Sequence, residues 1–480
     1  MSGEYLDLAR AQAAPLSLGA LLVGAALAAA LPHARASWVV AVFAALASAW
    51  AAVSFATQAL WAAGPIIDAG PLLTIDGVGA FAAPMIVSAV VAVMFAAGAL
   101  MERRRTAPFS MALALCAAAG WVGALLATDL LGVAAGAEAA WLASIGLIAL
   151  GGERGALNGA LRMLFTGGVS AMLVLIGVSM IGRAAGSMDV AAIAGAETPT
   201  VAAAGVMLVF VSLSLKAGLA PLHVWTGASL GRTDSFAALF VGTVGIVGAL
   251  AVATRVSVHA ASAPLIAGGV GAAIAALGVV AVVVGSAQAV GATNLRRLAG
   301  YALASQAGCV LLSLSLGSPA GFASALVQLF ALAAAALALF TGAAVVREPA
   351  LEALDGLGRR APLASAALTA GALSLMGAPL TIGFLGRWRL IEAAVGAGWW
   401  WMAGVTLLAS LAAVFYGGRL IERIYFRRDT NVRPASGDPW RYALAPALLA
   451  AIGAIALGFD PSIVLEAAGN ASSLLFGFGP

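Results

Sequence analysis

Long apolar runs follow one another along almost the whole chain. Each run is about 20 residues long, which is the length that an α-helix needs to cross ~30 Å of hydrocarbon. The runs are rich in Ala, Leu, Val and Gly, and they lack the short alternating segments of an outer-membrane barrel. Because backbone polar groups in lipid must be bonded within the segment, these runs are predicted to be helices. The sequence therefore predicts an all-α integral membrane protein.

Fourteen candidate spans can be counted, and only short linkers separate them, so no soluble domain is expected. Hydrophobic residues make up 63% of the 480 residues and charged residues only 9%, whereas a soluble domain carries about a quarter charged residues. The predicted limits of the spans are 14–31, 38–61, 78–101, 109–128, 130–150, 162–182, 201–225, 236–254, 263–284, 298–316, 322–346, 363–383, 391–417 and 442–459.

The arginines are concentrated in alternate loops. Eighteen of the 23 arginines lie in or beside the loops that follow odd-numbered spans. Because short cytoplasmic loops are enriched in arginine and lysine, these loops are predicted to be cytoplasmic. Both termini are then predicted to face the periplasm or exterior, and the chain is expected to be a multi-pass protein of the inner (cytoplasmic) membrane.

Lys216 is the only lysine in the chain, and it lies deep in the predicted seventh span. Arginine stays charged in any protein site, whereas a buried lysine can give up its proton. A residue that loads and unloads protons is therefore expected to be a lysine. The alternative is a lysine that snorkels to the head groups, although ionisable residues inside membrane spans are functional by default.

Glu138 is the second charged residue predicted to be buried. It lies near the middle of the fifth span, between small residues that let other helices or water approach closely. An unpaired carboxylate there would tend to be neutral, whereas a nearby lysine would favour the ionised form of both groups. We therefore predict that Glu138 and Lys216 lie within ion-pair or single-water distance. A purely structural ion pair between helices is the alternative interpretation of this pair.

Two further polar residues lie near interruptions of apolar spans. Arg387 follows the Gly377–Pro379 interruption. Because arginine does not deprotonate, Arg387 is interpreted either as a fixed positive charge that controls ion exit or as a snorkelling residue. His223 lies at the end of the seventh span, where it would either relay protons near neutral pH or be a satisfied polar residue of a helix end.

The interruptions at Gly218–Pro221 and Gly377–Pro379 lie in spans seven and twelve. Paired Gly/Pro interruptions in two halves of a chain indicate an inverted-repeat transporter with its site near the membrane midplane. Because the interruptions are five spans apart, an odd number, the two units would have opposite orientations. The predicted units are an N-terminal three-helix segment (1–105), two inverted repeats (109–255 and 263–417), and a cytoplasmic basic loop with the C-terminal helix (418–480).

Motifs for cofactors and metals are missing from the sequence. It contains no dinucleotide-binding glycine motif after a strand, no P-loop and no HExxH. Cys116 and Cys309 lie inside apolar runs, and neither belongs to a CxxC pair. We therefore expect no bound cofactor, no metal and no nucleic-acid partner. Energy for transport would come from an ion gradient or from a partner subunit.

Four segments resemble the antiporter-like membrane subunits that are shared by respiratory complex I (N-type) and the Mrp-type multisubunit cation/proton antiporters (D-type). The resemblance covers roughly residues 70 to 430 and implies fourteen helices, with two inverted five-helix repeats that are broken in helices seven and twelve. The four segments are Asp129–Glu138, Lys216–Trp225, Asn294–Gly308 and Gly377–Arg387.

This resemblance implies roles for individual residues. Glu138 matches the family's essential fifth-helix glutamate, and Lys216 matches its seventh-helix lysine. Arg387 falls where the family has a twelfth-helix lysine or glutamate. Two positions depart from the pattern: Ile246 replaces the usual lysine or histidine of the eighth helix, and Leu332 replaces a frequent histidine of the eleventh.

A third departure follows Trp225, where Thr226–Gly227–Ala228 replaces the family's Leu-Pro-Asp. The central polar axis is thus depleted, and either water bridges the gap or the subunit has lost full conduction. The leading interpretation is a subunit that moves protons, with or without exchange for Na⁺ or K⁺, beside other membrane subunits of a Mrp-type or complex I-type assembly. It would be the non-redox subunit of a quinone-reducing translocase or part of a cation/proton antiporter. The alternative is a scaffold subunit that does not conduct.

Overall fold

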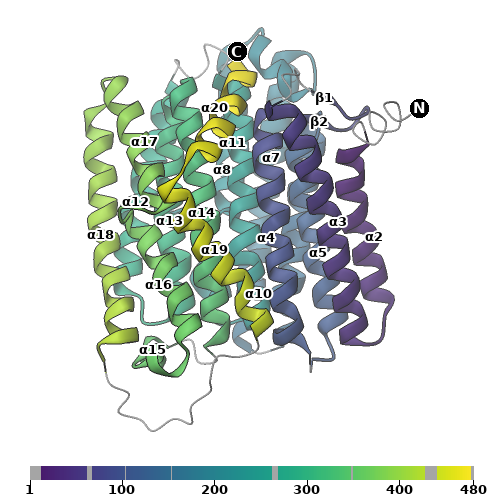
Figure 1. The fold of residues 1–480 in the computed structure, drawn as a ribbon. Helices are drawn as coiled ribbons and strands as arrows, with labels where there is room; N and C mark the ends of the chain where they lie inside the picture. Colours follow the sequence, from purple (N-terminus) through teal and green to yellow (C-terminus); the bar gives the residue numbers. More distant parts are fainter. Residues whose placement is uncertain are drawn as a thin grey trace.

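The computed structural model describes residues 12–61, 67–102, 104–152, 154–261, 269–346, 350–427 and 441–476. These residues form a bundle of long helices that run side by side between two ends of the molecule (Figure 1). Helix α2 begins and α20 ends at the same end, the upper one in Figure 1, and the short helix α15 lies at the lower end. The predicted all-α membrane class is confirmed.

The elements follow one another mainly as antiparallel helical hairpins. The first half of the chain contains α2 (Ala13–Ala30), α3 (Ala34–Trp61), β1 (Ile67–Asp68), β2 (Thr74–Ile75), α4 (Gly77–Met101), α5 (Ala107–Leu126), α6 (Leu130–Ala149), α7 (Arg154–Ala185), α8 (Pro199–Lys216) and α9 (Thr226–Leu230). The second half contains α10 (Ser235–Phe240), α11 (Ile246–Ala261), α12 (Gly271–Gly291), α13 (Leu295–Ser315), α14 (Pro319–Val345), α15 (Leu357–Arg360), α16 (Pro362–Met376), α17 (Ile382–Gly396), α18 (Trp400–Tyr425), α19 (Arg441–Phe459) and α20 (Ser462–Phe476).

The central helix of the bundle is the continuous span formed by α10, a π-helical turn at Val241–Gly245, and α11. Its most apolar 18-residue window is 100% buried inside the protein. The outer helix α7 is much more exposed, as expected for a helix that faces lipid. A short antiparallel hairpin of β1 and β2, in which Ile67 lies opposite Ile75, was not predicted from the sequence.

Glycines set the close packing of the first helix pair in each predicted repeat. A Cβ atom added to Gly120 of α5 would lie 2.7 Å from the carbonyl oxygen of Gly136 of α6. A Cβ atom on Gly308 of α13 would likewise lie 2.7 Å from the carbonyl oxygen of Gly278 of α12. Small residues let helix backbones approach this closely in membranes. The approach of α5 and α6 fixes the helix that carries Glu138.

The structure agrees with the prediction of about fourteen spans once the interrupted helix pairs α16–α17 and α19–α20 are each taken as one span. Among the described residues, 12 helices are long and apolar enough to cross a membrane, and the pair α19–α20, bent by 81°, makes a thirteenth. The interval 363–383 is not one helix: it holds α16, a break, and the start of α17, and each of these helices has 15 residues. The interval 391–417 likewise begins inside α17. Hydropathy does not register such breaks, because glycine and proline leave a run apolar.

The seventh predicted span is also shorter than expected. Helix α8 ends at Lys216, and the residues up to Trp225 form a non-helical connection before α9. Lys216 is thus the last residue of a helix and not an interior one. The Gly/Pro motifs that predicted breaks in spans seven and twelve do end α8 and α16 in the structure.

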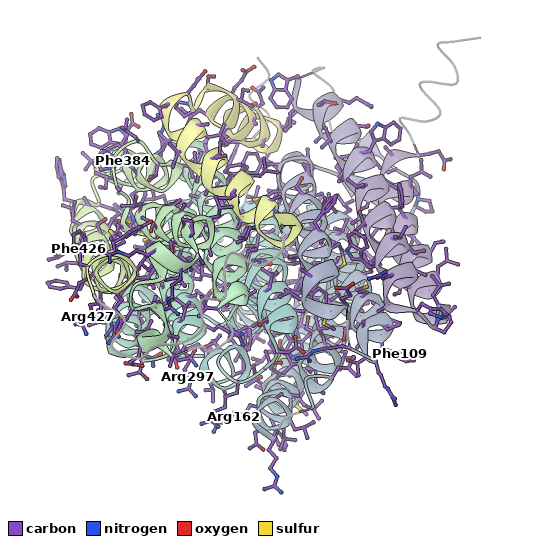
Figure 2. All side chains as sticks on the ribbon, turned by 60° about the horizontal axis from the view of Figure 1, so that its bottom comes forward. Phe109, Arg162, Arg297, Phe384, Phe426 and Arg427 are labelled. Carbon is purple, nitrogen blue, oxygen red and sulfur yellow. The ribbon has the colours of Figure 1, made fainter. Side chains whose placement is uncertain are left out.

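The arginines that Figure 2 labels, Arg162, Arg297 and Arg427, lie toward the lower end of the bundle. Which end faces the cytoplasm stays a prediction, and both Pro480 and the basic loop that begins at position 428 lie outside the described residues. We expect a reporter fused after Pro480 to lie outside the cell and a reporter inserted within 430–438 to lie in the cytoplasm. Two reporters on the same side would contradict the predicted topology.

Candidate functional site

Lys216 forms an ion pair with Glu138, as predicted from the sequence. The Lys216 Nζ atom lies 2.9 Å from Glu138 Oε1. Glu138 lies midway along α6, so the contact places Lys216 at mid-depth in the bundle. The Lys216 side chain is fully buried, whereas 24% of the Glu138 side chain is exposed at the side of the bundle. The glutamate is therefore less buried than the sequence analysis expected.

Aromatic rings enclose the lysine. Lys216 Nζ lies 5.2 Å from the centroid of the Trp141 ring, where the ring face attracts a cation. Trp141 meets Trp225 edge to face, with 5.1 Å between ring centroids. The indole of Trp225 donates to the carbonyl oxygen of Leu215 at 2.8 Å and so caps the end of α8. The Lys216–Glu138 pair thus lies beside a wall that excludes bulk water.

The ion pair leaves hydrogen-bonding capacity unused. Neither Lys216 Nζ nor Glu138 Oε1 has a hydrogen bond of good geometry among the described residues. An ammonium group has three donors, and buried polar atoms without protein partners are usually bonded to water. The ammonium group of Lys216 therefore keeps donors that no described protein group satisfies.

The end of α8 is a left-handed cap. Gly218 has φ of +67°, and the Leu219 amide donates to the Ser214 carbonyl oxygen at 3.0 Å. This arrangement is the common glycine-terminated helix end. It ends the helix just after Lys216, so the ammonium group lies where the regular backbone stops.

Helix α16 ends in the same way but carries no lysine. Gly377 has φ of +70°, and the Ala378 amide donates to the Leu373 carbonyl oxygen at 3.0 Å. Lys216 lies two residues before its left-handed glycine, and Leu375 lies two residues before Gly377. The second break therefore has an apolar residue at the place of Lys216.

Arg387 supplies the positive charge at this second break. Its guanidinium group donates to the carbonyl oxygens of Leu375 and Met376, the last two residues of α16, and to Ser410 Oγ at 2.7 Å. The residue is 3% exposed, and among the described residues no carboxylate lies within ion-pair distance of it. A positive charge at a helix C-terminus is stabilised by the helix dipole. Arg387 is thus a buried cap, which excludes the snorkelling interpretation.

His223 lies in the connection between α8 and α9. Its Nε2 atom lies 2.5 Å from Gln288 Oε1, and its ring meets the ring of Tyr301 edge to face. The Nδ1 atom has no hydrogen-bond partner among the described residues. These contacts join His223 to α12 and α13, whereas the Lys216–Glu138 pair joins α8 to α6.

The segment that replaces the family's Leu-Pro-Asp packs against α13. A Cβ atom on Gly227 would lie 2.1 Å from the Tyr301 hydroxyl, so only glycine fits there without movement. The Gly227 carbonyl oxygen accepts from Arg297 Nε at 3.0 Å. The two other departures are apolar and buried, since Ile246 is 1% and Leu332 2% exposed.

The structure reveals a second buried ionic cluster, which was not predicted from the sequence. Asp76 accepts from Arg255 Nε at 2.5 Å, and its Oδ2 atom lies 3.2 Å from His259 Nε2. Asp76 also caps α4 by accepting from the Gly79 amide at 2.7 Å. Arg255 donates further to the Ala127 carbonyl oxygen at 2.7 Å. The cluster therefore joins α4 and α11 to the end of α5.

The neighbours of Asp76 in this cluster favour its ionised form over its protonated form. Burial by itself would raise the pKa of Asp76, but the Arg255 guanidinium, His259 and the Gly79 amide together hold that pKa well below its usual range.

The Asp129 carboxylate caps α6 as Asp76 caps α4, by accepting from the Gly132 amide at 2.6 Å. Within the described part of the chain, no group of three or more His, Cys, Asp or Glu side chains is arranged to hold a metal ion.

Comparisons with solved structures agree with this fold. A chain of the Mrp complex from Dietzia sp. superposes with a TM-score of 0.86 over 97% of both chains, at 21% sequence identity. A chain of respiratory complex I from Thermus thermophilus superposes with a TM-score of 0.80 at 26% identity, and the match covers 94% of this chain and 98% of that one. The fold is therefore that of a membrane chain found in multisubunit assemblies.

Sequence comparisons identify the family. The NADH-quinone oxidoreductase subunit N 1 of Solidesulfovibrio magneticus is 31% identical over 353 residues, which cover 69% of this chain and 72% of that protein. The model of the NADH:quinone oxidoreductase/Mrp antiporter transmembrane family matches residues 127–412. This interval contains the Lys216–Glu138 pair and both helix breaks. The chain belongs to the family of antiporter-like membrane subunits that complex I and the Mrp antiporters share.

Proposed function

We propose that the chain translocates protons as one membrane subunit of a multisubunit assembly, with Glu138 and Lys216 as the proton-loading pair. The observation that carries this proposal is the 2.9 Å contact between a buried ammonium group and a carboxylate at the broken end of α8. The carboxylate stabilises the charged form of Lys216, and the apolar walls favour its neutral form. A small movement of Glu138 therefore changes the proton occupancy of the lysine.

Two features make proton movement at this site physically reasonable. The regular helix stops at Lys216, so a small backbone movement at this break would admit water to the ammonium group. The exposed part of Glu138 lies at the side of the bundle, where a neighbouring chain can supply the next proton carrier. The partners would be other membrane subunits, and the transported ion would be H⁺, alone or in exchange for Na⁺ or K⁺.

A second candidate function is a scaffold that holds neighbouring subunits without conducting. The observation in its favour is the second half of the chain, where Arg387 is bound to backbone carbonyl oxygens and Ile246 and Leu332 are apolar. Proton passage through that half would need water in place of titratable side chains. The two candidates differ in whether removing the charge of Glu138 affects transport.

We expect Glu138→Gln to leave the subunit in the assembled complex but to reduce gradient formation in vesicles by roughly tenfold or more, a factor that corresponds to about 1.4 kcal/mol. Glutamine keeps the size of the side chain but cannot stabilise the charged lysine. The matched control is Glu392→Gln, which removes the charge of a glutamate that pairs with Arg389 at the surface of α17. Unchanged gradient formation by Glu138→Gln at full assembly would favour the scaffold.

A further inference from the structure

An apolar groove opens in the side of the bundle between α3 and α4 on one side and α19 and α20 on the other. In Figure 1, α19 rises obliquely from the lower end across α14, and α20 continues after a bend to the upper end. Leu457 and Ile463, which lie on either side of the 81° bend between these two helices, both line the groove. The cavity has a volume of about 530 Å³, and α14 forms its floor.

The walls of this groove offer almost no polar groups. Its hydroxyl-bearing residues are Thr57 and Ser88, and the Thr57 hydroxyl donates to the Ser54 carbonyl oxygen at 3.0 Å. The indole N–H of Trp61, at the rim, donates to Glu466 Oε1 at 2.9 Å. A ligand of this groove therefore has to be a hydrocarbon, because a polar molecule would lose its hydrogen bonds with water on entering.

The upper end of the groove is closed by contacts between α20 and the N-terminal helices. Asn470 donates to the Leu60 carbonyl oxygen at 2.9 Å. The Ala471 carbonyl oxygen lies so close to Gly77 that a Cβ atom there would be 2.1 Å away. The groove stays open at the side, where Leu449 and Ile463 are 70% and 64% exposed.

The depth of the groove matches one leaflet of a bilayer. On α4 its lining extends from Ala80 to Ala89, while the helix begins at Gly77. At 1.5 Å per residue, these positions lie about 5 to 18 Å below the upper end of the helix. The acyl chains of one leaflet occupy about 15 Å, half of the hydrocarbon thickness. A second cavity of about 360 Å³, which shares Ser88 and Ala450, continues the groove downward.

A whole helix of a partner or of a second copy is too large to be enclosed in the groove. A membrane-spanning helix about 10 Å wide and 30 Å long occupies on the order of 2,000 Å³, several times the volume of the groove. A helix would also collide with α20 at the closed end. A flexible chain of methylene groups, by contrast, can follow the bend and fill the groove along its length.

We propose that this groove is a specific lipid site, which holds an acyl chain of a membrane phospholipid from the leaflet at the upper end. The head group lies beside Trp61, at the level where tryptophan side chains commonly meet the membrane interface. The lipid fills the space under the bent α19–α20 pair and supports its position against α3 and α4. This site is separate from the Lys216–Glu138 pair, so it stands whether or not the chain conducts.

The test uses the full chain, stripped of lipid in detergent, returned to vesicles of a single phosphatidylethanolamine, and analysed by native mass spectrometry after mild extraction. Gly453 of α19 lines the groove, and a Cβ atom there meets no atom within 4 Å. Gly453→Phe therefore fills the groove without a backbone clash. Gly404→Phe is the matched control, because Gly404 on α18 also has open space around its Cβ position and lies away from the groove.

We expect the wild-type chain and Gly404→Phe to retain one more phospholipid than Gly453→Phe, with equal unfolding temperatures for the three. Ala450→Leu adds a smaller side chain to the same groove and should reduce the occupancy of that lipid. It keeps the test decisive if Gly453→Phe does not fold. Equal lipid counts in the wild type and Gly453→Phe would overturn the proposal. It would also be overturned if the chain from native membranes carried an isoprenoid lipid that Gly453→Phe displaced.

Discussion

Lys216→Arg is expected to assemble normally and yet to reduce gradient formation nearly as much as Lys216→Ala, by roughly tenfold or more, which corresponds to about 1.4 kcal/mol or above. The guanidinium group keeps the positive charge beside Glu138, so the ion pair and the fold survive. It does not release a proton in a protein site, so the proposed carrier stays loaded. The measurement is gradient formation in vesicles that hold the assembled complex, with subunit content quantified in parallel.

Arg389→Lys is the matched control for this exchange, because Arg389 forms an exposed ion pair with Glu392 and lies outside the proposed pair. We expect it to transport like the wild type. Normal transport by Lys216→Arg would show that Lys216 is only a structural counter-ion of Glu138. In that case the scaffold function would be the better explanation of the site.

Asp76→Ala is expected to cause the largest loss of stability among single changes outside the candidate site. The change leaves the Arg255 guanidinium buried at 2% exposure without its carboxylate. Removing one partner of a buried ion pair costs about 3–5 kcal/mol. The measurement is the free energy of unfolding of the purified chain in detergent, or the corresponding drop in its unfolding temperature.

Asp129→Ala provides the comparison, because Asp129 caps α6 as Asp76 caps α4 but is only half-buried. Loss of a helix cap alone costs about 1 kcal/mol. We expect the Asp76 variant to be less stable than the Asp129 variant by the contribution of the ionic cluster. Equal losses would mean that the contacts of Asp76 with Arg255 and His259 add nothing beyond the cap.

Lowering the pH should remove the contribution of the Asp76 cluster to the stability of the wild-type chain. Because the folded-state pKa of Asp76 lies below its ordinary value of about 3.9, its stabilisation is fully present above that value. This stabilisation is lost as the pH falls from there toward the pKa of the folded state. We expect Asp76→Ala to lack this part of the acid destabilisation, so the difference between wild type and variant should shrink below about pH 4.

The sequence by itself determined the class of the protein and the principal pair. Apolar runs of span length in lipid can only be helices, because no other segment bonds all its backbone groups internally. A sole lysine and a mid-span glutamate are each costly to bury alone, so their pairing could be predicted before any distance was known. The 2.9 Å contact of Lys216 with Glu138 confirms that reasoning.

The Gly/Pro motifs predicted that spans seven and twelve are broken, but only the tertiary structure decided the residue at which each helix stops and what the remaining charges bind. Hydropathy passes over the breaks after Lys216 and Met376, since the glycines and prolines that end these helices are themselves apolar. Arg387 meets the carbonyl oxygens of α16 eleven and twelve residues upstream, and Asp76 meets Arg255 across 179 residues of sequence. No local pattern encodes such contacts, because they depend on which helices pack together and at what depth.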